Sequence, residues 1–509
     1  MKKFFITTAI DYPNSLPHVG TAFEKIGADV MARYKRLCGY ETCFLMGNDE
    51  HAVNVEKKAL SLGLDTQEYC NKMAEKFKAV WKQLNVSYDR FIQTSEPAHI
   101  KASQEMFLRA QKNGDIYKGK YKGWYCNSCE SYVKEKDLVE GKCPVHNMPP
   151  AAIEEENYFF ALSKYRDRIL KFIEENPSFV EPEIRRNEVL NILKEGLEDL
   201  SISRSNFKWG IPVPGDDSGH AIYVWFDALI NYITGAGFSD DAEKFARLWP
   251  ADVHVIGKDI TRFHCIIWPA MLMSAGVALP KKVFGHGFVY NKGAKMSKTL
   301  GTVVDPAGVA EKYGADTLRF FLVRENPFGQ DGEFSIEKLE SRYNSDLAND
   351  LGNLLHRTLT MTEKYQQGRM ARPADIAPDA ELQAKLDAAI KAYEPLMDAF
   401  EFRDALAKIW ELISYLNTYI EKSAPWTLAK EKKFDRIAKV MYDVCESLRI
   451  ISIMISPVVP ASAEKIYAQL GLDAVKPMKD MRIEDIKQWG AIPDGLEVKK
   501  GAPVFQRIV

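Results

Sequence analysis

The segment that decides the fold opens the chain: residues 4–37 read FFITTAIDYPNSLPHVGTAFEKIGADVMARYKRL. Phe4 to Ile10 is an apolar run, and the prolines and asparagine of Asp11 to Pro17 are typical of a loop. Gly20 to Leu37 has helical periodicity, and Glu41 to Met46 reads as a second strand. This alternation predicts an α/β fold with a doubly wound parallel sheet and its ligand at the carboxyl ends of the strands.

Composition places the chain among ordinary globular proteins. Its 509 residues include 68 Lys and Arg against 70 Asp and Glu, so a strongly basic nucleic-acid coat is not expected. The N-terminal MKKFFITTAI has two lysines before an apolar run, but Thr7 and Thr8 interrupt the run and no small-residue cleavage site follows. No stretch approaches the roughly twenty apolar residues of a membrane span. We therefore expect a soluble, cytoplasmic protein with no membrane association.

The alternation of expected strands and helices changes twice along the chain. Charged, aromatic and cysteine-bearing sequence interrupts the nucleotide fold, which resumes with strands expected at Ala221 to Phe226 and Val253 to Ile256. Later, long amphipathic patterns predict a helical bundle, at Ser345 to Gln367, Ala380 to Glu421 and Lys433 to Ile455. The expected regions are the first half of a Rossmann-type catalytic fold (1–116), a zinc-binding insertion (117–210), the second half (211–325), a linker (326–345) and an all-α domain (346–509).

Two short motifs suit phosphate. His18-Val19-Gly20-Thr21 lies where the first loop enters the first helix, and amides and the helix dipole favour anions there. Far downstream, Lys295-Met296-Ser297-Lys298-Thr299 is flanked by Gly293 and Gly301, so it can bring positive charge to a triphosphate. Alone, the first could be a plain turn and the second a solvated basic turn. Together, in this order and setting, they favour phosphate binding.

PHVGT and KMSKT resemble the two signature motifs of class I aminoacyl-tRNA synthetases, usually written HIGH and KMSKS. The similarity is closest to the methionine enzymes and covers nearly the whole chain. It implies activation of L-methionine with magnesium-bound ATP and transfer to tRNA(Met), initiator tRNA included, with His18, Thr21, Lys295 and Lys298 in catalysis. Thr21 replaces the usual second histidine, and a hydroxyl carries no positive charge.

The resemblance also implies two ligand sites. Methionine is long, apolar and polarizable, so a selective pocket should combine aromatic walls with a few polar groups. In isolation such aromatic residues are more often core. The implied methionine site comprises Ile10, Asp49, Trp225, Tyr232, Phe263, His264 and Trp268. The implied ATP site comprises Tyr12, His18, Gly20, Gly257, Asp259, Val289 and Lys298.

A metal site is expected in the insertion. Cys126 and Cys129 are separated by two residues, as are Cys143 and His146, and three thiolates with one imidazole make a closed tetrahedral zinc site. Such a site has no position open to substrate, so one structural zinc per chain is expected. The other cysteines show no such pattern and are expected to be buried thiols.

Three residues of the helical end are candidates for RNA recognition. Asn353 and Arg357 are four residues apart on one helix face and can supply an acceptor and donors to a base edge, while Trp426 can stack on a base. Each alone is commonplace on a bundle surface. The resemblance implies that they bind the anticodon. No further C-terminal domain of the kind found in dimeric relatives follows the bundle, and a monomer is expected.

Other functions share some of these features. A different class I synthetase would share the phosphate motifs, a small nucleotidyltransferase would need neither the cysteine cluster nor the bundle, and a non-catalytic RNA-binding protein would need neither the lysine loop nor the aromatic pocket.

Overall fold

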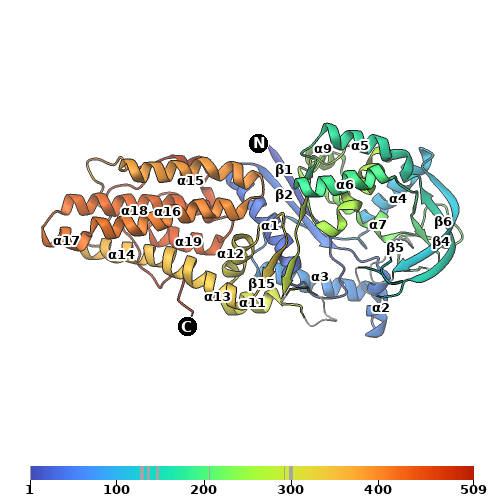
Figure 1. The fold of residues 1–509 in the computed structure, drawn as a ribbon, viewed down its shortest axis with the longest axis horizontal. Coiled ribbons are helices and arrows are strands. Elements are labelled where there is room, and N and C mark those ends of the chain that lie inside the picture. Colours follow the sequence, from blue (N-terminus) through green and yellow to red (C-terminus); the bar gives the residue numbers. More distant parts are fainter. Residues whose placement is uncertain are drawn as a thin grey trace.

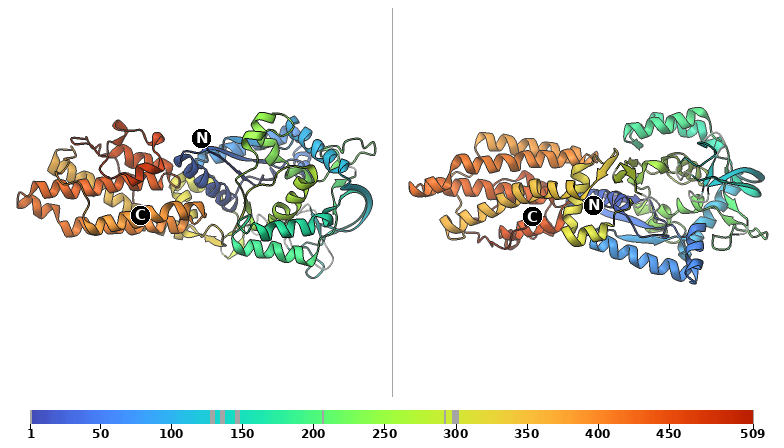
Figure 2. Two further views of the ribbon diagram at one scale, coloured as in Figure 1. Left: turned by 90° about the horizontal axis from the view of Figure 1, so that it is seen from above. Right: turned by 60° about the horizontal axis from the view of Figure 1, so that its bottom comes forward.

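The computed structural model describes residues 2–126, 131–133, 138–144, 148–205, 207–291, 293–296 and 302–508. The molecule is elongated, with a sheet-containing region at one end and a bundle of long helices at the other (Figure 1). The views in Figure 2 likewise show the bundle extending away from one side of the sheet region. In the described part of the chain, no helix is long and apolar enough to cross a bilayer.

The central sheet has six strands in the order β3-β2-β1-β11-β12-β7, and all neighbouring pairs are parallel. The strands are β1 (Lys3–Thr8), β2 (Glu41–Asn48), β3 (Arg90–Gln93), β7 (Val180–Glu181), β11 (Val253–Gly257) and β12 (Val283–His286). Because the chain leaves β1 toward β2 on one side and later returns to β11 on the other, the strand order reverses at β1. Ligands of such sheets bind at this reversal, beyond the carboxyl ends of the strands. The expected parallel α/β fold is confirmed.

Helices pack around this sheet. The helix that follows β1 is α1 (Val19–Leu37), and one side of it is buried almost throughout. The other helices of the first half are α2 (Val53–Ser61), α3 (Thr66–Gln83) and α4 (Pro97–Lys112). The expected first strand and first helix therefore occur within about two residues of their predicted ends.

The strand expected at Ala221 to Phe226 is wrong in most of its length. Only β10 (Ala221–Ile222) is extended, and it pairs with β9 (Ser203–Arg204). The chain then turns into α7 (Val224–Ala228), where the amides of Phe226 and Asp227 bond to the carbonyl of Tyr223. A short apolar run is ambiguous between strand and buried helix, and long-range packing decided here.

The insertion contains its own antiparallel sheet, in the order β5-β4-β6-β8. Its strands are β4 (Ile116–Cys126), β5 (Ser131–Val133), β6 (Ala151–Phe160) and β8 (Leu200–Ser201), and its helices are α5 (Arg166–Glu175) and α6 (Glu183–Glu195). Between these helices β7 leaves to pair with β12 of the central sheet. The segment 117–210 is thus tied to the nucleotide fold and also supplies its edge strand.

The second half of the catalytic fold continues to residue 342. Its helices are α8 (Asn231–Ala236), α9 (Ala242–Leu248), α10 (Trp268–Ala275), α11 (Pro306–Tyr313), α12 (Ala315–Glu325) and α13 (Ile336–Arg342). A small sheet in the order β14-β13-β15 comprises β13 (Val289–Asn291), β14 (Ala294–Lys295) and β15 (Gly332–Phe334). The predicted linker 326–345 therefore includes a strand and a helix.

The bundle begins with a π-helical segment, Tyr343–Gly352, that continues into α14 (Asn353–Gln366). The remaining helices are α15 (Ala380–Asp398), α16 (Phe402–Ser423), α17 (Pro425–Lys430), α18 (Phe434–Ile455) and α19 (Pro460–Gln469). The amphipathic pattern from Ala380 to Glu421 is formed by two helices, α15 and α16. The break occurs at Phe400, whose φ is +61° and whose ring stacks on Phe284 of β12 at 4.4 Å. The helix ends here because Phe400 packs against Phe284 of the central sheet.

A buried arginine joins the two regions. Arg319 of α12 is completely buried, and its Nη2 lies 2.7 Å from a carboxylate oxygen of Asp29 in α1. Its Nε and Nη2 also donate to the carbonyls of Val458 and Pro457, between α18 and α19. A charged guanidinium out of water requires such partners. The bundle is therefore fastened directly to the helix that begins at the candidate phosphate site.

Candidate active site

The start of α1 is organised by His18. This residue caps the helix, and its Nδ1 accepts a hydrogen bond of 3.2 Å from the amide of Thr21. A neutral imidazole that accepts at Nδ1 carries its proton on Nε2, which can donate to a phosphate oxygen. A Cβ on Gly20 would lie 2.9 Å from the His18 ring, so glycine is required for this arrangement as well as for ligand approach.

Two amides expected to face phosphate are already engaged in this structure. The Thr21 amide bonds to His18, and the Val19 amide donates to the carbonyl of Val304 at 3.0 Å. Val304 lies just beyond the lysine motif, so α1 and the end of that loop are in direct contact. In this structure, the expected phosphate contacts of α1 would therefore come from His18 Nε2 and other side chains and not from these two amides.

The lysine motif extends from a short hairpin. Lys295 belongs to β14 and its backbone pairs with Tyr290 of β13, while Met296 is buried. Lys298 lies outside the described residues, and the side chain of Lys295 is likewise not described. The hairpin nevertheless places the start of the motif at the same end of the fold as Val304 and α1.

The candidate ribose edge lies at the end of β11. A Cβ on Gly257 would meet Asp259 Oδ1 at 2.7 Å, so the carboxylate of Asp259 lies directly over this glycine. Asp259 is exposed, Tyr12 is half-buried, and Val289 is buried in β13. A carboxylate beyond a parallel strand suits ribose hydroxyls.

Five of the seven residues expected at the methionine site line one narrow cavity of about 40 Å³: Ile10, Asp49, Trp225, Tyr232 and His264. Phe263 forms part of the same wall, because its ring stacks on Trp225 with 3.9 Å between centroids. The volume is that of a few water molecules, so the walls must move before an amino acid can enter. Lining residues that the sequence did not single out as ligands include Ala9, Ala228, Asn231 and Ile260.

Two polar side chains of this cavity, Tyr232 and His264, are uncharged. His264 Nδ1 lies 3.0 Å from the carbonyl of Ile260 and must donate to it, so Nε2 accepts from the Tyr232 hydroxyl at 2.6 Å. Burial lowers the pKa of His264 to about 4, which keeps the imidazole neutral at pH 7. Burial also raises the pKa of the Tyr232 phenol well above its usual value.

His254 of β11 is a buried residue of the site that sequence reasoning missed. Its ring stacks on Tyr232 at 4.2 Å, and its Nε2 accepts from the indole of Trp268 at 3.3 Å. His254 Nδ1 lies 2.6 Å from the hydroxyl of Thr7 in β1. Trp268 therefore supports Tyr232 from behind through His254. The available signal was a histidine within an otherwise apolar strand.

A second buried histidine cluster anchors α7, which carries Trp225. The carboxylate of Asp227 accepts from His51 Nδ1 and His99 Nε2, each at 2.6 Å. Burial alone would raise the pKa of Asp227, but the two histidines lower it to about 2. His51 follows Asp49 by two residues, so this cluster fixes the carboxylate-bearing end of β2 against the aromatic wall.

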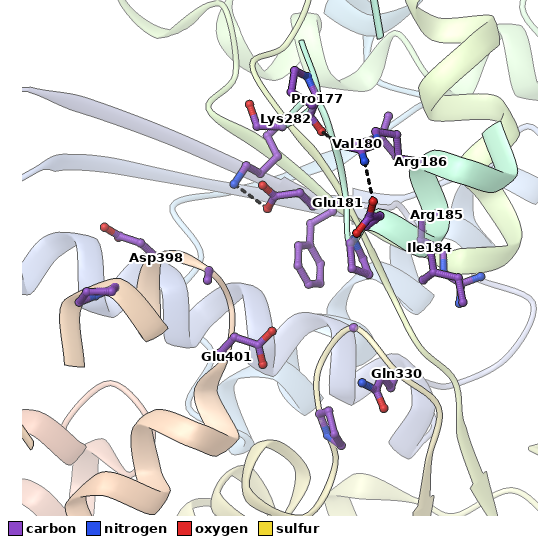
Figure 3. A pocket seen from close by; sticks show the side chains of 18 of the residues that line it. Pro177, Val180, Glu181, Ile184, Arg185, Arg186, Lys282, Gln330, Asp398 and Glu401 are labelled. Carbon is purple, nitrogen blue, oxygen red and sulfur yellow. Dashed lines mark hydrogen bonds and ion pairs between the residues drawn. The ribbon is translucent and has the colours of Figure 1, made fainter. Parts of the chain in front are cut away.

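A much larger groove lies elsewhere. It has a volume of about 1180 Å³ and separates β7 and α6 from the turn between α15 and α16 (Figure 3). Two ion pairs lie among its lining residues: Glu181 accepts from Lys282 at 2.7 Å, and Glu183 from Arg186 at 2.9 Å. None of the residues expected at the methionine or ATP site is among those that line this groove.

Comparisons with known proteins identify the family. A family model described as class I tRNA synthetases (M) matches residues 4–152 and 145–359. A second, for the anticodon-binding domain of methionyl-tRNA ligase, matches residues 373–509. The methionine–tRNA ligase of Caldanaerobacter subterraneus is 48% identical over 510 residues, covering 100% of this chain and 79% of the relative. The chain belongs to the methionyl-tRNA synthetases.

Other relatives support the same family assignment. The methionine–tRNA ligase of Thermotoga maritima is 48% identical over 511 residues, covering 99% of this chain and 80% of the relative. A structure of Mycobacterium tuberculosis methionyl-tRNA synthetase in complex with methionyl-adenylate superposes with a TM-score of 0.95 at 43% identity and covers 100% of both chains. This synthetase therefore shares its whole architecture with an enzyme captured with an activated amino acid.

The methionyl-tRNA synthetase fold places α17, the helix that carries Trp426, at the end of the bundle that points away from the sheet region (Figure 1). Trp426 is 39% exposed on α17, and Asn353 is exposed on α14. Arg357 forms a 2.6 Å ion pair with Glu421 of α16, just before the turn into α17. This pair brings Arg357 toward the segment that carries Trp426, although it also engages the guanidinium expected to read a base.

Only half of the expected zinc site of this synthetase can be placed. Cys126, at the end of β4, and Cys143 are each 2% exposed. Cys129 and His146 lie outside the described residues. Within the described ranges no group of three possible metal ligands is found.

Proposed function

We propose that this chain activates L-methionine with ATP to methionyl-adenylate and transfers methionine to the 3′-terminal adenosine of tRNA(Met). The observation that carries the proposal is the convergence of Ile10, Asp49, Trp225, Tyr232 and His264 on one cavity. Methionine–tRNA ligase activity is that of the full-length relatives.

Methionine binding follows from the chemistry of the cavity. The Asp49 carboxylate receives the substrate ammonium, and Trp225 and Phe263 provide a polarizable wall for the thioether chain. Tyr232 and His264, both uncharged, can approach the sulfur without the desolvation cost of an ion.

Activation is an in-line displacement. A carboxylate oxygen of methionine attacks the α-phosphorus of ATP, and the bond to pyrophosphate breaks as charge spreads over phosphoryl oxygens. His18 Nε2 is positioned to donate to a phosphate oxygen, and Lys295 and Lys298 neutralise the leaving pyrophosphate. Magnesium accompanies ATP and adds positive charge there. In the second step a hydroxyl of the terminal adenosine attacks the methionyl carbonyl, and AMP leaves.

The ATP base and ribose have their own contacts in this proposal. Asp259 above Gly257 bonds the ribose hydroxyls, with Tyr12 and Val289 against the adenosine. Thr21 contributes only its hydroxyl, since its amide is engaged by His18. The cationic part of phosphate binding therefore rests on the lysines.

We also propose one structural zinc held by Cys126, Cys129, Cys143 and His146. The two described cysteines fit, because they are buried thiols in a loop-rich segment with little hydrophobic core. Metal analysis should find one zinc per chain, and Cys129→Ser should lose both metal and thermal stability. Cys265→Ser is the matched control, since Cys265 is a buried thiol of the catalytic fold. Full zinc content in Cys129→Ser would contradict the ligand assignment.

Anticodon recognition is assigned to Trp426, Asn353 and Arg357. Trp426 offers an exposed indole for stacking, and the segment around α17 carries exposed basic side chains that suit a phosphate backbone. These side chains extend from the end of α16 to the start of α18 and are Lys422, Lys430, Lys432, Lys433 and Arg436.

The decisive experiment is exchange of labelled pyrophosphate into ATP, tested across the amino acids. Exchange should depend on methionine and should not require tRNA. Exchange with another amino acid would indicate a different class I synthetase, and binding of tRNA without any exchange would indicate a non-catalytic RNA-binding protein.

A further inference from the structure

A buried lysine lies beneath the loop that leads from β1 into α1. Lys25 is one helical turn beyond Thr21 and is completely buried, together with the adjacent Glu24. An ammonium group out of water costs several kcal/mol unless it is paired and hydrogen-bonded. The site chemistry described above makes no use of this lysine, so its retention in the core calls for an explanation.

Three acceptors surround the ammonium. Lys25 Nζ lies 2.6 Å from the carbonyl of Ala9, 2.7 Å from Glu24 Oε1 and 3.2 Å from Asp11 Oδ2. Burial works against the charge, but Asp11 and Glu24 outweigh it and raise the pKa of Lys25. The lysine is therefore charged. Its ammonium donates hydrogen bonds to Ala9 and Glu24, and its contact with Asp11 is an ion pair.

The groups that Lys25 holds belong to the methionine cavity. Ala9 lines the cavity, and Ile10, also in its wall, lies between Ala9 and Asp11. The carbonyl of Asp11 accepts from the amide of Asp49 at 2.9 Å, and the amide of Asp11 donates to Gly47 of β2 at 3.0 Å. Lys25 thus fixes both ends of a three-residue segment that in turn orients the candidate ammonium ligand.

The same cluster reaches the other side of the site. Glu24 Oε2 lies 2.9 Å from Nε2 of His286, which ends β12 just before the hairpin that carries the lysine motif. Glu24 therefore bridges Lys25 and the nucleotide side, whereas the ammonium of Lys25 bonds to Ala9, Glu24 and Asp11. Substitution of Lys25 should accordingly affect methionine more than ATP.

We propose that Lys25 is a positioning residue for methionine: its ammonium holds the Ala9–Asp11 segment in the shape that presents Ile10 and Asp49 to the substrate. The proposal rests on the methionine site assigned above. Loss of this role should affect methionine selectively and not ATP. A general contribution of Lys25 to folding would not produce such a selective effect.

The test compares Lys25→Met with Lys35→Met. Lys35 is on the same helix and forms a 2.5 Å ion pair with Asp398, away from the cavity. In pyrophosphate exchange Lys25→Met should raise the KM for methionine about tenfold or more and leave the KM for ATP within about twofold, because the Ala9–Asp11 segment loses its anchor. Equilibrium dialysis with labelled methionine, without ATP, should show the same loss of affinity. Lys35→Met should change neither.

Two further variants sharpen the result. Lys25→Arg keeps the charge and should lose less methionine affinity than Lys25→Met. Asp11→Asn keeps its backbone bonds to Gly47 and Asp49 but loses the ion pair, so it should weaken methionine in the same direction. The Lys25→Met/Asp11→Asn double variant should lose less than the product of the single losses, since both act through one contact.

The proposal would be overturned by a folded Lys25→Met enzyme with wild-type methionine affinity, or by equal increases in both KM values. If Lys25→Met does not fold, Asp11→Asn decides by the same criteria. Failure of the methionine assignment itself is distinguishable, because the wild-type enzyme would then show no methionine-dependent exchange.

Discussion

The methionine cavity and the outer end of the helical bundle illustrate two kinds of binding site in one chain. In the cavity, residues from distant segments converge, and Tyr232 and His264 are buried and bonded to each other. At the bundle, Trp426 is 39% exposed and Arg357 pairs with Glu421 across two helices. Burial and convergence thus reveal a site for a small substrate before it binds. They do not reveal a surface that RNA completes.

The reason lies in what each ligand supplies. A methionine side chain is apolar, so a pocket that selects it is expected to combine buried aromatic walls with uncharged polar groups. A tRNA brings its own charge and its own flat bases, so an exposed ring and solvated cations suffice. Variants at the two ends should therefore affect different reactions.

The largest effect is expected at the catalytic end. Lys298→Ala removes a cation from the developing pyrophosphate charge, and losses of such groups typically reduce the rate by roughly 100- to 1,000-fold. Pre-steady-state adenylate formation should slow accordingly, while methionine affinity by dialysis should not change. An unaltered activation rate would mean that the charge is met elsewhere.

Trp426→Ala should be next in size and should act at the other end only. Base–aromatic stacking is worth about 1–3 kcal/mol, which corresponds to roughly 5- to 150-fold in aminoacylation. Pyrophosphate exchange, which needs no tRNA, should stay near wild type. Trp426→Phe, which retains a ring, should recover part of the charging activity. Equal loss in both reactions would show that Trp426 only stabilises the bundle.

Arg357→Ala should reduce base selectivity rather than overall activity. We expect the preference for cytosine over uracil at the first anticodon position to shrink by about tenfold, measured with variant tRNAs. Glu421→Gln is the matched control, because it releases Arg357 from its ion pair and keeps the guanidinium. It should preserve the preference. Unchanged selectivity in Arg357→Ala would place cytosine recognition on other residues.

The smallest effects concern solution conditions. Because the pKa of His264 is lowered to about 4, the imidazole is neutral from pH 8 to pH 6, and methionine affinity should be flat there. As pH falls toward 4 the ring gains a proton and affinity should weaken, a loss that His264→Phe should lack. A methionine affinity that titrates near pH 6.5 would contradict the buried, neutral histidine.

Affinity for tRNA should instead depend on salt, and it should fall at least about tenfold between 50 and 200 mM salt.

Local signals were sufficient for the opening elements and insufficient for others. The apolar run, the proline-rich loop and the periodic helix predicted β1 and α1 nearly to the residue. The same kind of signal did not locate the helix break at Phe400, and it wrongly predicted a strand at Tyr223 to Phe226. There the backbone follows contacts with residues far away in the chain, such as Phe284, and such contacts have no periodicity to read.

By itself, the sequence determined the parallel α/β fold, the helical end and the family, because strand and helix periods and the two phosphate motifs are local properties of the chain. It also named five of the residues that line the small aromatic cavity. Only the tertiary structure decided which buried charges pair. Lys25 meets Ala9 and Asp11, and Arg319 meets Asp29 and the carbonyls near Val458. A buried charge takes its partner from whatever the fold brings within about 3 Å, and no pattern along the chain encodes that proximity.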